Sequence, residues 1–152
     1  YEGSRTRDNL HREKQGVFHV TDDVELLARA AVGRLERPPP LVAATSVQGQ
    51  ILADACRWYA FRVQRWDDES PRANVTCRIV DRGTIREFFG FNRAKHAVVE
   101  AAILATRIDR LPRPEILRQF AALSKLVEKT GGEEERHAFE FLQEYVQNKA
   151  AE

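Results

Sequence analysis

Apolar residues recur with the spacing of an α-helix between residues 93 and 108. One broad stripe of this helix consists mostly of small side chains: Ala94, Ala97, Val98, Ala101, Ala105 and Ile108. The opposite side carries a narrow polar strip, which is made of Arg93, His96, Glu100 and Arg107. Asn92 stands where an N-cap belongs, because its side chain can accept hydrogen bonds from the first backbone amides. We therefore predict a buried central helix, whose polar strip is either a salt-bridged outer edge or the lining of a ligand site.

Two further helices are predicted after this one. Residues 115–130 repeat apolar positions with the same period, and Gly131-Gly132 is expected to end that helix in a left-handed cap. Three glutamates, 133–135, then begin a last helix, where negative charge suits the helix dipole. The expected packing faces are Ile116, Phe120, Leu123 and Val127, and then Ala138, Phe141, Leu142 and Tyr145. The last third of the chain is therefore predicted to be a small helical bundle.

Alternation with a period of two predicts a β-hairpin in the middle of the chain. Residues 55–66 and 72–80 flank the turn 67–71. Pairing Trp66 with Arg72 places the side chains of three apolar residues opposite three others: Tyr59, Phe61 and Val63 opposite Ile79, Cys77 and Val75. One face of the hairpin is then consistently apolar, and such a face normally fixes the register.

The two cysteines, Cys56 and Cys77, would point to opposite faces of this hairpin. They could then not form a disulfide. Two free thiols suit a reducing compartment, so a cytoplasmic protein is expected.

Shorter elements precede the hairpin. A helix over residues 6–15 is expected, capped by Ser4 or Thr6 and ended by Gly16, with a strand over residues 17–21. A second helix is expected to start at Asp22, in a capping box with Glu25, and to end at Gly33. Its predicted apolar face is Leu26, Leu27, Ala30 and Ala31. The prolines 38–40 predict a stiff, extended connector.

Composition narrows the possible functions. The chain has 152 residues and a formal net charge of +1, so its electrostatics favour neither nucleic acid nor an anionic membrane as a partner. No apolar run is long enough to span a bilayer. The four histidines and two cysteines lack the spacing of metal ligands, so no metal site is predicted. The chain contains no methionine and opens on Tyr1, so we expect upstream residues to be missing from it.

One stretch, residues 3–10, combines groups that bind phosphate. Two hydroxyls and two guanidinium groups stand at the start of the first predicted helix, where backbone amides and the helix dipole favour an anion. The same residues would also suit a capped surface helix with solvated arginines, and the sequence leaves both interpretations open.

Several segments resemble an uncharacterised family of FMN-binding split β-barrel proteins with a helical C-terminal subdomain. The resemblance covers nearly the whole chain, and it is carried by residues 2–6, 9–10, 17–23, 88–107 and 127–132, most specifically by Phe-Asn-Arg-Ala at 91–94. Such proteins are similar to flavin reductases and pyridoxamine-phosphate oxidases. The resemblance implies an α+β fold: an antiparallel split β-barrel over residues 1–87, lacking its first strands, and a helical subdomain over residues 88–152 packed on it.

The resemblance also implies a function. Members of such a family are homodimers that hold FMN at the subunit interface. The resemblance therefore implies a flavin-dependent oxidoreductase. Its substrate is unknown, and the family's context implies a link to pterin-dependent one-carbon metabolism. Arg5 would neutralise the phosphate, Ser4 and Thr6 would hydrogen-bond it, and residues 17–21 would run beside the flavin ring, with His19 where many split barrels carry Asn. The cofactor-binding residues implied are Ser4, Arg5, Thr6, Asn9, His19, Thr21, Asn92, Arg93 and His96. The alternative is a non-catalytic binding or scaffold protein that acts through dimerisation.

Overall fold

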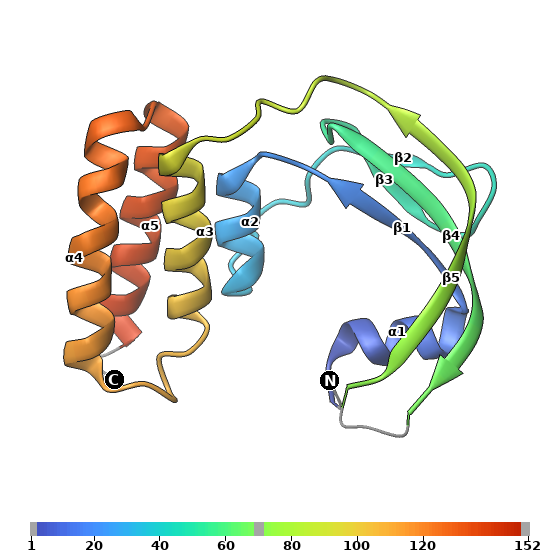
Figure 1. Ribbon diagram of the computed structural model, residues 1–152, viewed down its shortest axis with the longest axis horizontal. Coiled ribbons are helices and arrows are strands. Elements are labelled where there is room, and N and C mark those ends of the chain that lie inside the picture. The colour runs from blue at the N-terminus through green and yellow to red at the C-terminus, as the bar shows by residue number, and fades with distance from the viewer. Residues whose placement is uncertain (1–2, 69–71, 150–152) are drawn as a thin grey trace. The chain divides into compact units, whose positions relative to one another are not determined.

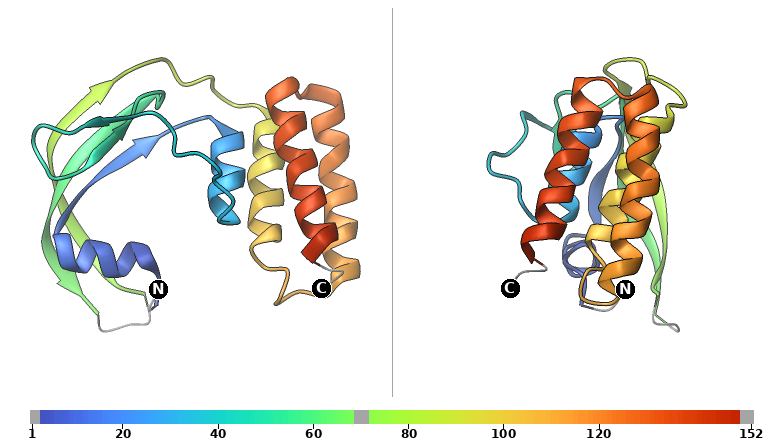
Figure 2. Two further views of the ribbon diagram at one scale, coloured as in Figure 1. Left: turned by 180° about the vertical axis from the view of Figure 1, so that it is seen from behind. Right: turned by 90° about the vertical axis from the view of Figure 1, so that its left-hand side faces the viewer.

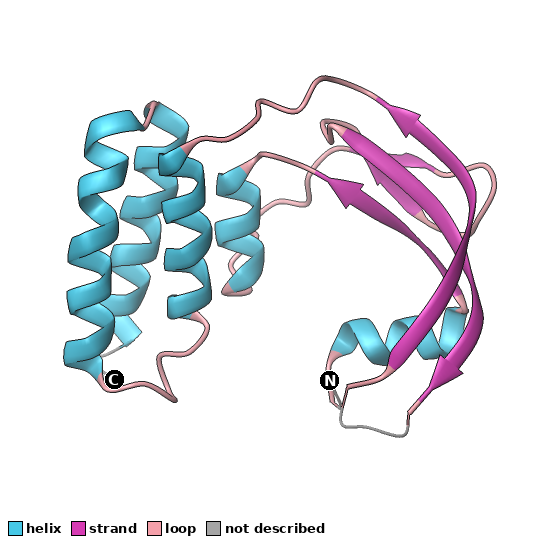
Figure 3. Ribbon diagram, viewed as in Figure 1, coloured by secondary structure: helices cyan, strands magenta, loops and turns pink. Residues whose placement is uncertain are grey.

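The computed structural model describes residues 3–68 and 72–149, and it has a mixed α+β architecture with antiparallel sheets (Figure 1). The chain divides into two compact units. The strand unit comprises residues 1–21 and 39–88, and the helical unit comprises residues 22–38 and 89–152. Among the described residues, every strand belongs to the strand unit, and α2 to α5 belong to the helical unit (Figure 3). The segment 22–38 thus lies with the helices, although the predicted boundary at residue 87 had placed it with the strands.

The strand unit contains two antiparallel sheets. Its elements are α1 (Arg5–Glu13), β1 (Gln15–Val20), β2 (Leu41–Ala43), β3 (Gln50–Leu52), β4 (Arg57–Asp67) and β5 (Asn74–Thr84). One sheet has the strand order β1-β4-β5, and β2 pairs with β3 in the other. The described strands do not close into a barrel. The antiparallel α+β expectation is therefore confirmed at this level.

The β4–β5 hairpin exists, but its predicted register is wrong by two residues at Phe61–Val63 and by three in the rest of the ladder, where Trp66 pairs with Val75 rather than with Arg72. Phe61 pairs with Ile79 and Val63 pairs with Cys77, and register shifts interrupt the ladder on both sides of this stretch. The shift of two residues keeps side chains on their faces, so the alternation of apolar residues could not detect it, and the bulges that add the third residue leave no periodic signal. Cys77 still shares a face with Phe61, and both cysteines are free thiols, as expected.

The ends of the first two helices differ from the prediction. Helix α1 stops at Glu13 because Lys14 itself takes the left-handed conformation (φ 54°), while Gly16 lies inside β1. A Cβ at Gly16 would lie 3.0 Å from Cζ of Phe61, so this glycine permits a close approach of the ring. The N-cap of α2 (Val24–Ala31) is the Asp23 carboxylate rather than Asp22, since its Oδ1 accepts the amide of Leu26 at 2.8 Å.

The helical unit is a bundle in which α3 (Arg93–Ala105) packs against α2, α4 (Arg113–Thr130) and α5 (Glu133–Lys149) (Figure 2). The Asn92 cap is confirmed, because its Oδ1 accepts the amides of Ala94 and Lys95 at 2.8 and 3.0 Å. The predicted stripe of α3 is confirmed for Ala94, Ala97, Val98, Ala101 and Ala105, which are buried together with Ala102 and Leu104, whereas Ile108 lies beyond the end of α3 and is half-buried. Residue periodicity therefore identified the centre of this core correctly.

Two details of the bundle correct the prediction. In α2 the buried residues are Val24 and Ala28, whereas Ala30 and Ala31 of the predicted apolar face are exposed. Gly131 ends α4 in an extended conformation (φ −85°) rather than a left-handed one. A Cβ at Gly131 would lie 2.6 Å from the carbonyl oxygen of Val127, so the glycine is needed for space.

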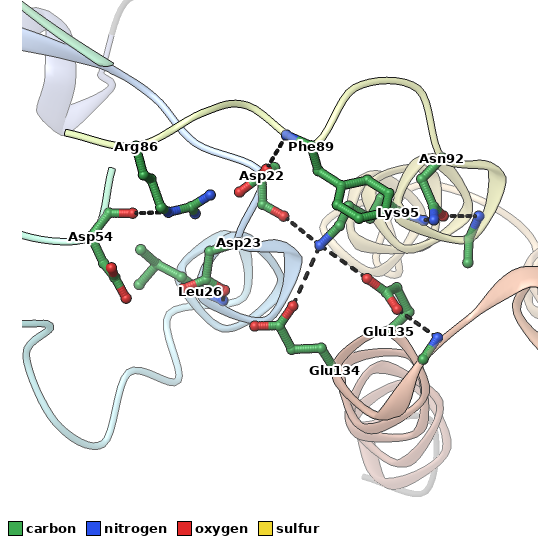
Figure 4. Close-up of polar contacts among 12 residues, drawn as sticks. Asp22, Asp23, Leu26, Asp54, Arg86, Phe89, Asn92, Lys95, Glu134 and Glu135 are labelled. Carbon is green, nitrogen blue, oxygen red and sulfur yellow. Dashed lines mark hydrogen bonds and ion pairs between the residues drawn. The ribbon is translucent and has the colours of Figure 1, made fainter. Parts of the chain in front are cut away.

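A polar cluster joins three helix N-termini within this unit (Figure 4). Lys95 Nζ lies 2.9 Å from the backbone oxygen of Asp22, 2.9 Å from Glu135 Oε1 and 3.4 Å from Glu134 Oε2. Glu135, which is only 6% exposed, also accepts the amide of Gly132 at 2.7 Å. The Asp22 carboxylate accepts the amide of Phe89 at 2.7 Å. We call Asp22, Lys95, Glu134 and Glu135 the Lys95 cluster.

The Lys95 cluster shifts the titration of its own members. Burial favours neutral Glu135, but hydrogen bonds from Lys95 and the Gly132 amide outweigh it and hold the pKa of the carboxyl below its ordinary value. Burial likewise favours neutral Lys95, yet Glu135 and Glu134 raise the pKa of the ammonium above its ordinary value. Both groups are therefore charged at neutral pH.

Lys95→Met is expected to lower the free energy of unfolding by about 3–5 kcal/mol, because it leaves a buried carboxylate without its partner. Lys125→Met on the exposed side of α4 is the matched control, with an expected change within about 0.5 kcal/mol. Adding Glu135→Gln to Lys95→Met should recover much of the loss. Urea unfolding of the four proteins tests this, and equal midpoints for the two lysine variants would contradict it.

The same cluster predicts sensitivity to acid. A carboxyl whose pKa is lowered by folding stabilises the protein above its unfolded pKa, and this stabilisation is lost as pH falls through the folded pKa. The stability difference between the native chain and Glu135→Gln should thus be constant above the model-compound pKa of 4.5 and shrink below it. Thermal unfolding measured from pH 7 to pH 3 would show this, and a difference that grows on acidification would contradict the assignment.

Candidate functional site

The residues implied as cofactor ligands are divided between the two units. Ser4, Arg5, Thr6, Asn9, His19 and Thr21 belong to the strand unit, and Asn92, Arg93 and His96 belong to the helical unit. The first group includes residues that line a cavity, so the site is described from this unit.

A cavity of about 280 Å³ lies beside the N-terminal half of α1. We call it the α1 cavity, and its lining residues are Ser4, Thr6, Arg7, Leu10, Trp66, Ala73 and Val75. Ser4 caps the helix, since its Oγ accepts the amide of Arg7 at 3.3 Å. Ser4 and Thr6 thus line one cavity, and Arg7 brings a guanidinium group to it.

That guanidinium group belongs to Arg7, because Arg5 is exposed and does not line the cavity. Asn9 is also exposed, and its Oδ1 accepts a hydrogen bond from Arg12 at 3.1 Å. The resemblance had assigned Arg5, and not Arg7, to the phosphate. The signal that distinguishes them is the helical spacing of Arg7 with His11 and Lys14.

Arg7 and His11 of α1, and Lys14 directly after it, contact the indole of Trp66 in β4. Lys14 Nζ lies 5.0 Å and Arg7 Cζ 6.0 Å from the ring centroid, and the His11 ring packs edge-on at 5.1 Å. None of the nine residues of α1, all of which the structure describes, is buried. Cation–π contacts with Trp66 therefore position α1, and each contributes roughly 0.5–1 kcal/mol at such an exposed place.

His19 makes a structural contact within the strand unit. Its Nε2 accepts the backbone amide of Leu52 in β3 at 3.0 Å, and burial lowers the pKa of the imidazole. The ring is thus neutral, with its proton on Nδ1. Thr21, directly after β1, is partly buried.

The predicted polar strip of α3 contributes different groups than expected. The Asn92 side-chain oxygen is used by the helix cap, and Arg93 and His96 are exposed. Lys95, which sequence analysis did not single out, lies in the Lys95 cluster instead. Its partner carboxylates are about forty residues away in the sequence, so periodicity could not reveal them.

Within residues 3–68 and 72–149, no three His, Cys, Asp or Glu side chains come close enough to hold a metal ion. Within the same ranges, no helix has the length and apolar character that crossing a membrane requires.

A crystal structure of an FMN-bound protein from Methanosarcina mazei, in family DUF447, superposes with a TM-score of 0.80 at 24% sequence identity. The match covers 95% of this chain and 78% of that one. No curated protein matches the chain significantly.

Two family models match successive parts of the sequence. The N-terminal domain of the proteins of unknown function DUF447 matches residues 1–86, and the C-terminal part of the same family matches residues 92–144. The first match alone covers more than half of the 152 residues. The chain therefore belongs to the DUF447 family of proteins of unknown function.

Proposed function

We propose that this protein binds FMN and acts as a flavin-dependent oxidoreductase of the flavin reductase and pyridoxamine-phosphate oxidase superfamily. The fold shared with an FMN-bound member of the DUF447 family carries this proposal. In this view the strand unit is part of a split β-barrel. The α1 cavity, with its two hydroxyls and one guanidinium group, supplies the chemistry that the cofactor needs.

The phosphate of FMN fits the first turn of α1. A phosphate monoester carries close to two negative charges at neutral pH, and helix N-termini present amides and a positive dipole end. Ser4 and Thr6 would donate hydrogen bonds from their hydroxyls, and Arg7 would supply a planar pair of donors. Arg5, exposed in the same turn, would add positive charge.

The flavin ring requires an apolar surface, and the β1-β4-β5 sheet has one. Phe18 is 60% exposed and Ile79 is 50% exposed, on the face that also carries Tyr59 and Phe61. The rings of Phe18 and Tyr59 lie 6.4 Å apart. We propose that a second copy of the chain covers this face in a homodimer, and that β1 with His19 and Thr21 runs beside the ring.

In this proposal the flavin supplies the hydride or electron transfer when bound, and the protein supplies binding and orientation. Ser4, Thr6 and Arg7 hold the phosphate end, while the apolar sheet face excludes water from the ring. Pterin-linked one-carbon metabolism is the proposed context of the substrate.

The exposed apolar face also favours a second candidate function, that of a non-catalytic scaffold which acts through dimerisation. Absorbance between 350 and 500 nm of the purified protein separates the two functions. A flavin spectrum that bleaches with a reduced nicotinamide donor supports the oxidoreductase, whereas a dimer that binds no flavin supports the scaffold.

Arg5→Glu is expected to weaken FMN binding by about tenfold or more, because it places negative charge beside the phosphate. Riboflavin has no phosphate and should lose far less affinity. Arg110→Glu, an exposed arginine of the helical unit, is the control for net charge. Quenching of flavin fluorescence measures both affinities. Equal losses for the two ligands, or FMN held by a monomer, would show that the phosphate placement is wrong.

The α3 residues allow a second test. Asn92→Ala should cost about 1 kcal/mol of stability through the lost cap. If Arg93 and His96 serve the cofactor, replacing either by alanine should weaken FMN retention and leave the melting temperature of the apoprotein nearly unchanged. Thermal unfolding and flavin titration of the three variants distinguish these roles. Unchanged FMN retention would remove Arg93 and His96 from the site.

A further inference from the structure

Trp66, which lines the α1 cavity, carries an indole N–H with no well-aligned hydrogen bond among the described residues. Trp66 Nε1 is shielded from solvent, and no oxygen in the part of the chain that the structure describes meets hydrogen-bond geometry with it. A buried N–H that lacks a well-aligned acceptor is unfavourable for the folded protein. The N–H can therefore still donate to an anion that lies beside it, and the side chains of Arg7 and Lys14 over the same ring are cationic.

A carboxylate of the chain itself already lies beside Arg7. The carboxylate of Asp68, the residue after β4, lies 3.1 Å from Arg7 Nη2. The nearby indole N–H of Trp66, followed by Arg7, lowers the pKa of Asp68, so the carboxyl is ionised at neutral pH. The two side chains are 26% and 41% exposed, and ion pairs this exposed contribute little net stability. Another anion can thus replace Asp68 at small cost.

We propose that the Asp68 carboxylate competes with the phosphate of the ligand for Arg7. In the free protein Asp68 pairs with Arg7, and a phosphate monoester displaces it on binding. The inference rests on the proposed FMN site and adds the residue that regulates its affinity. On displacement, Arg7 and the Trp66 N–H donate to phosphate oxygens, alongside the hydroxyls of Ser4 and Thr6. The carboxylate turns toward solvent, to which it is already partly exposed.

The competition has a definite consequence for ligand choice. A phosphate dianion gains more from Arg7 than a carboxylate does, because it carries a second charge and a third oxygen. A singly charged or neutral ligand gains less and does not displace Asp68. The carboxylate therefore makes the site selective for dianionic phosphate monoesters, at the expense of absolute affinity.

Asp68→Asn tests the proposal, with FMN, riboflavin and inorganic phosphate as the probes. The variant removes the competing charge and retains a side chain of the same size. We expect FMN to bind three- to tenfold more tightly to Asp68→Asn than to the native chain in low salt, with a smaller gain in high salt. Riboflavin affinity should be unchanged, and inorganic phosphate should displace FMN from the variant at a lower concentration.

Asp54→Asn is the matched control, since it makes the same change of net charge at an exposed position of the strand unit outside the α1 cavity. Both of its flavin affinities should remain native. Trp66→Phe keeps an aromatic ring but removes the N–H, and it should weaken FMN binding without weakening riboflavin binding.

The outcomes separate this inference from the proposed function. Native FMN binding with an unchanged or weaker affinity in Asp68→Asn overturns the competition and leaves the FMN site standing. An equal gain for FMN and riboflavin also overturns it, because the effect would then not involve the phosphate. Failure of every form to bind FMN or phosphate overturns both.

Discussion

The ammonium group of Lys95 is the contact on which the arrangement of the helical unit depends. The group extends from α3, and its neighbours come from the start of α2 and the start of α5, so one cation connects segments that are far apart in the sequence. Burial of the Lys95 ammonium or of the Glu135 carboxylate alone would be unfavourable, and each charge offsets the cost of burying the other. The same contact ties residues 22–38, which separate β1 from β2 in the sequence, to the helices, and Val24 and Ala28 of this segment are buried in the bundle core.

The first helix is held by a contrasting principle. Helix α1 buries no residue, and its cationic side chains pack on Trp66 instead. Lys14 takes an uncommon left-handed conformation that brings the chain from α1 into β1, and its ammonium group lies over the same indole. A helix attached through charge, at the edge of a cavity, leaves its first turn accessible to an anion. The position of the proposed phosphate site is therefore a consequence of how α1 is attached.

The strand unit has a small buried core and leaves several large apolar side chains exposed. Its buried apolar residues are few and mostly small, namely Val47, Ile51, Ala55, Cys56 and Ala60. Large apolar side chains such as Phe18 and Ile79 remain exposed on one face of the sheet. A sheet face of this kind is normally covered by another surface, and a flavin ring with a second protein copy is chemically suited to that role. In the proposed function, cofactor binding and dimerisation would both bury this exposed apolar face.

The sequence by itself determined the features that depend on neighbours three or four residues apart: the Asn92 cap, the buried stripe of α3 and the packing positions of α4. It also indicated that hydroxyl and guanidinium groups gather near Ser4. The tertiary structure alone decided the hairpin register, because a shift of two residues preserves both faces and bulges leave no periodic signal. It alone showed that Arg7 rather than Arg5 lines the cavity, and that Lys95 meets Glu135. Those contacts join residues distant in sequence, and local patterning carries no information about which distant group will be near.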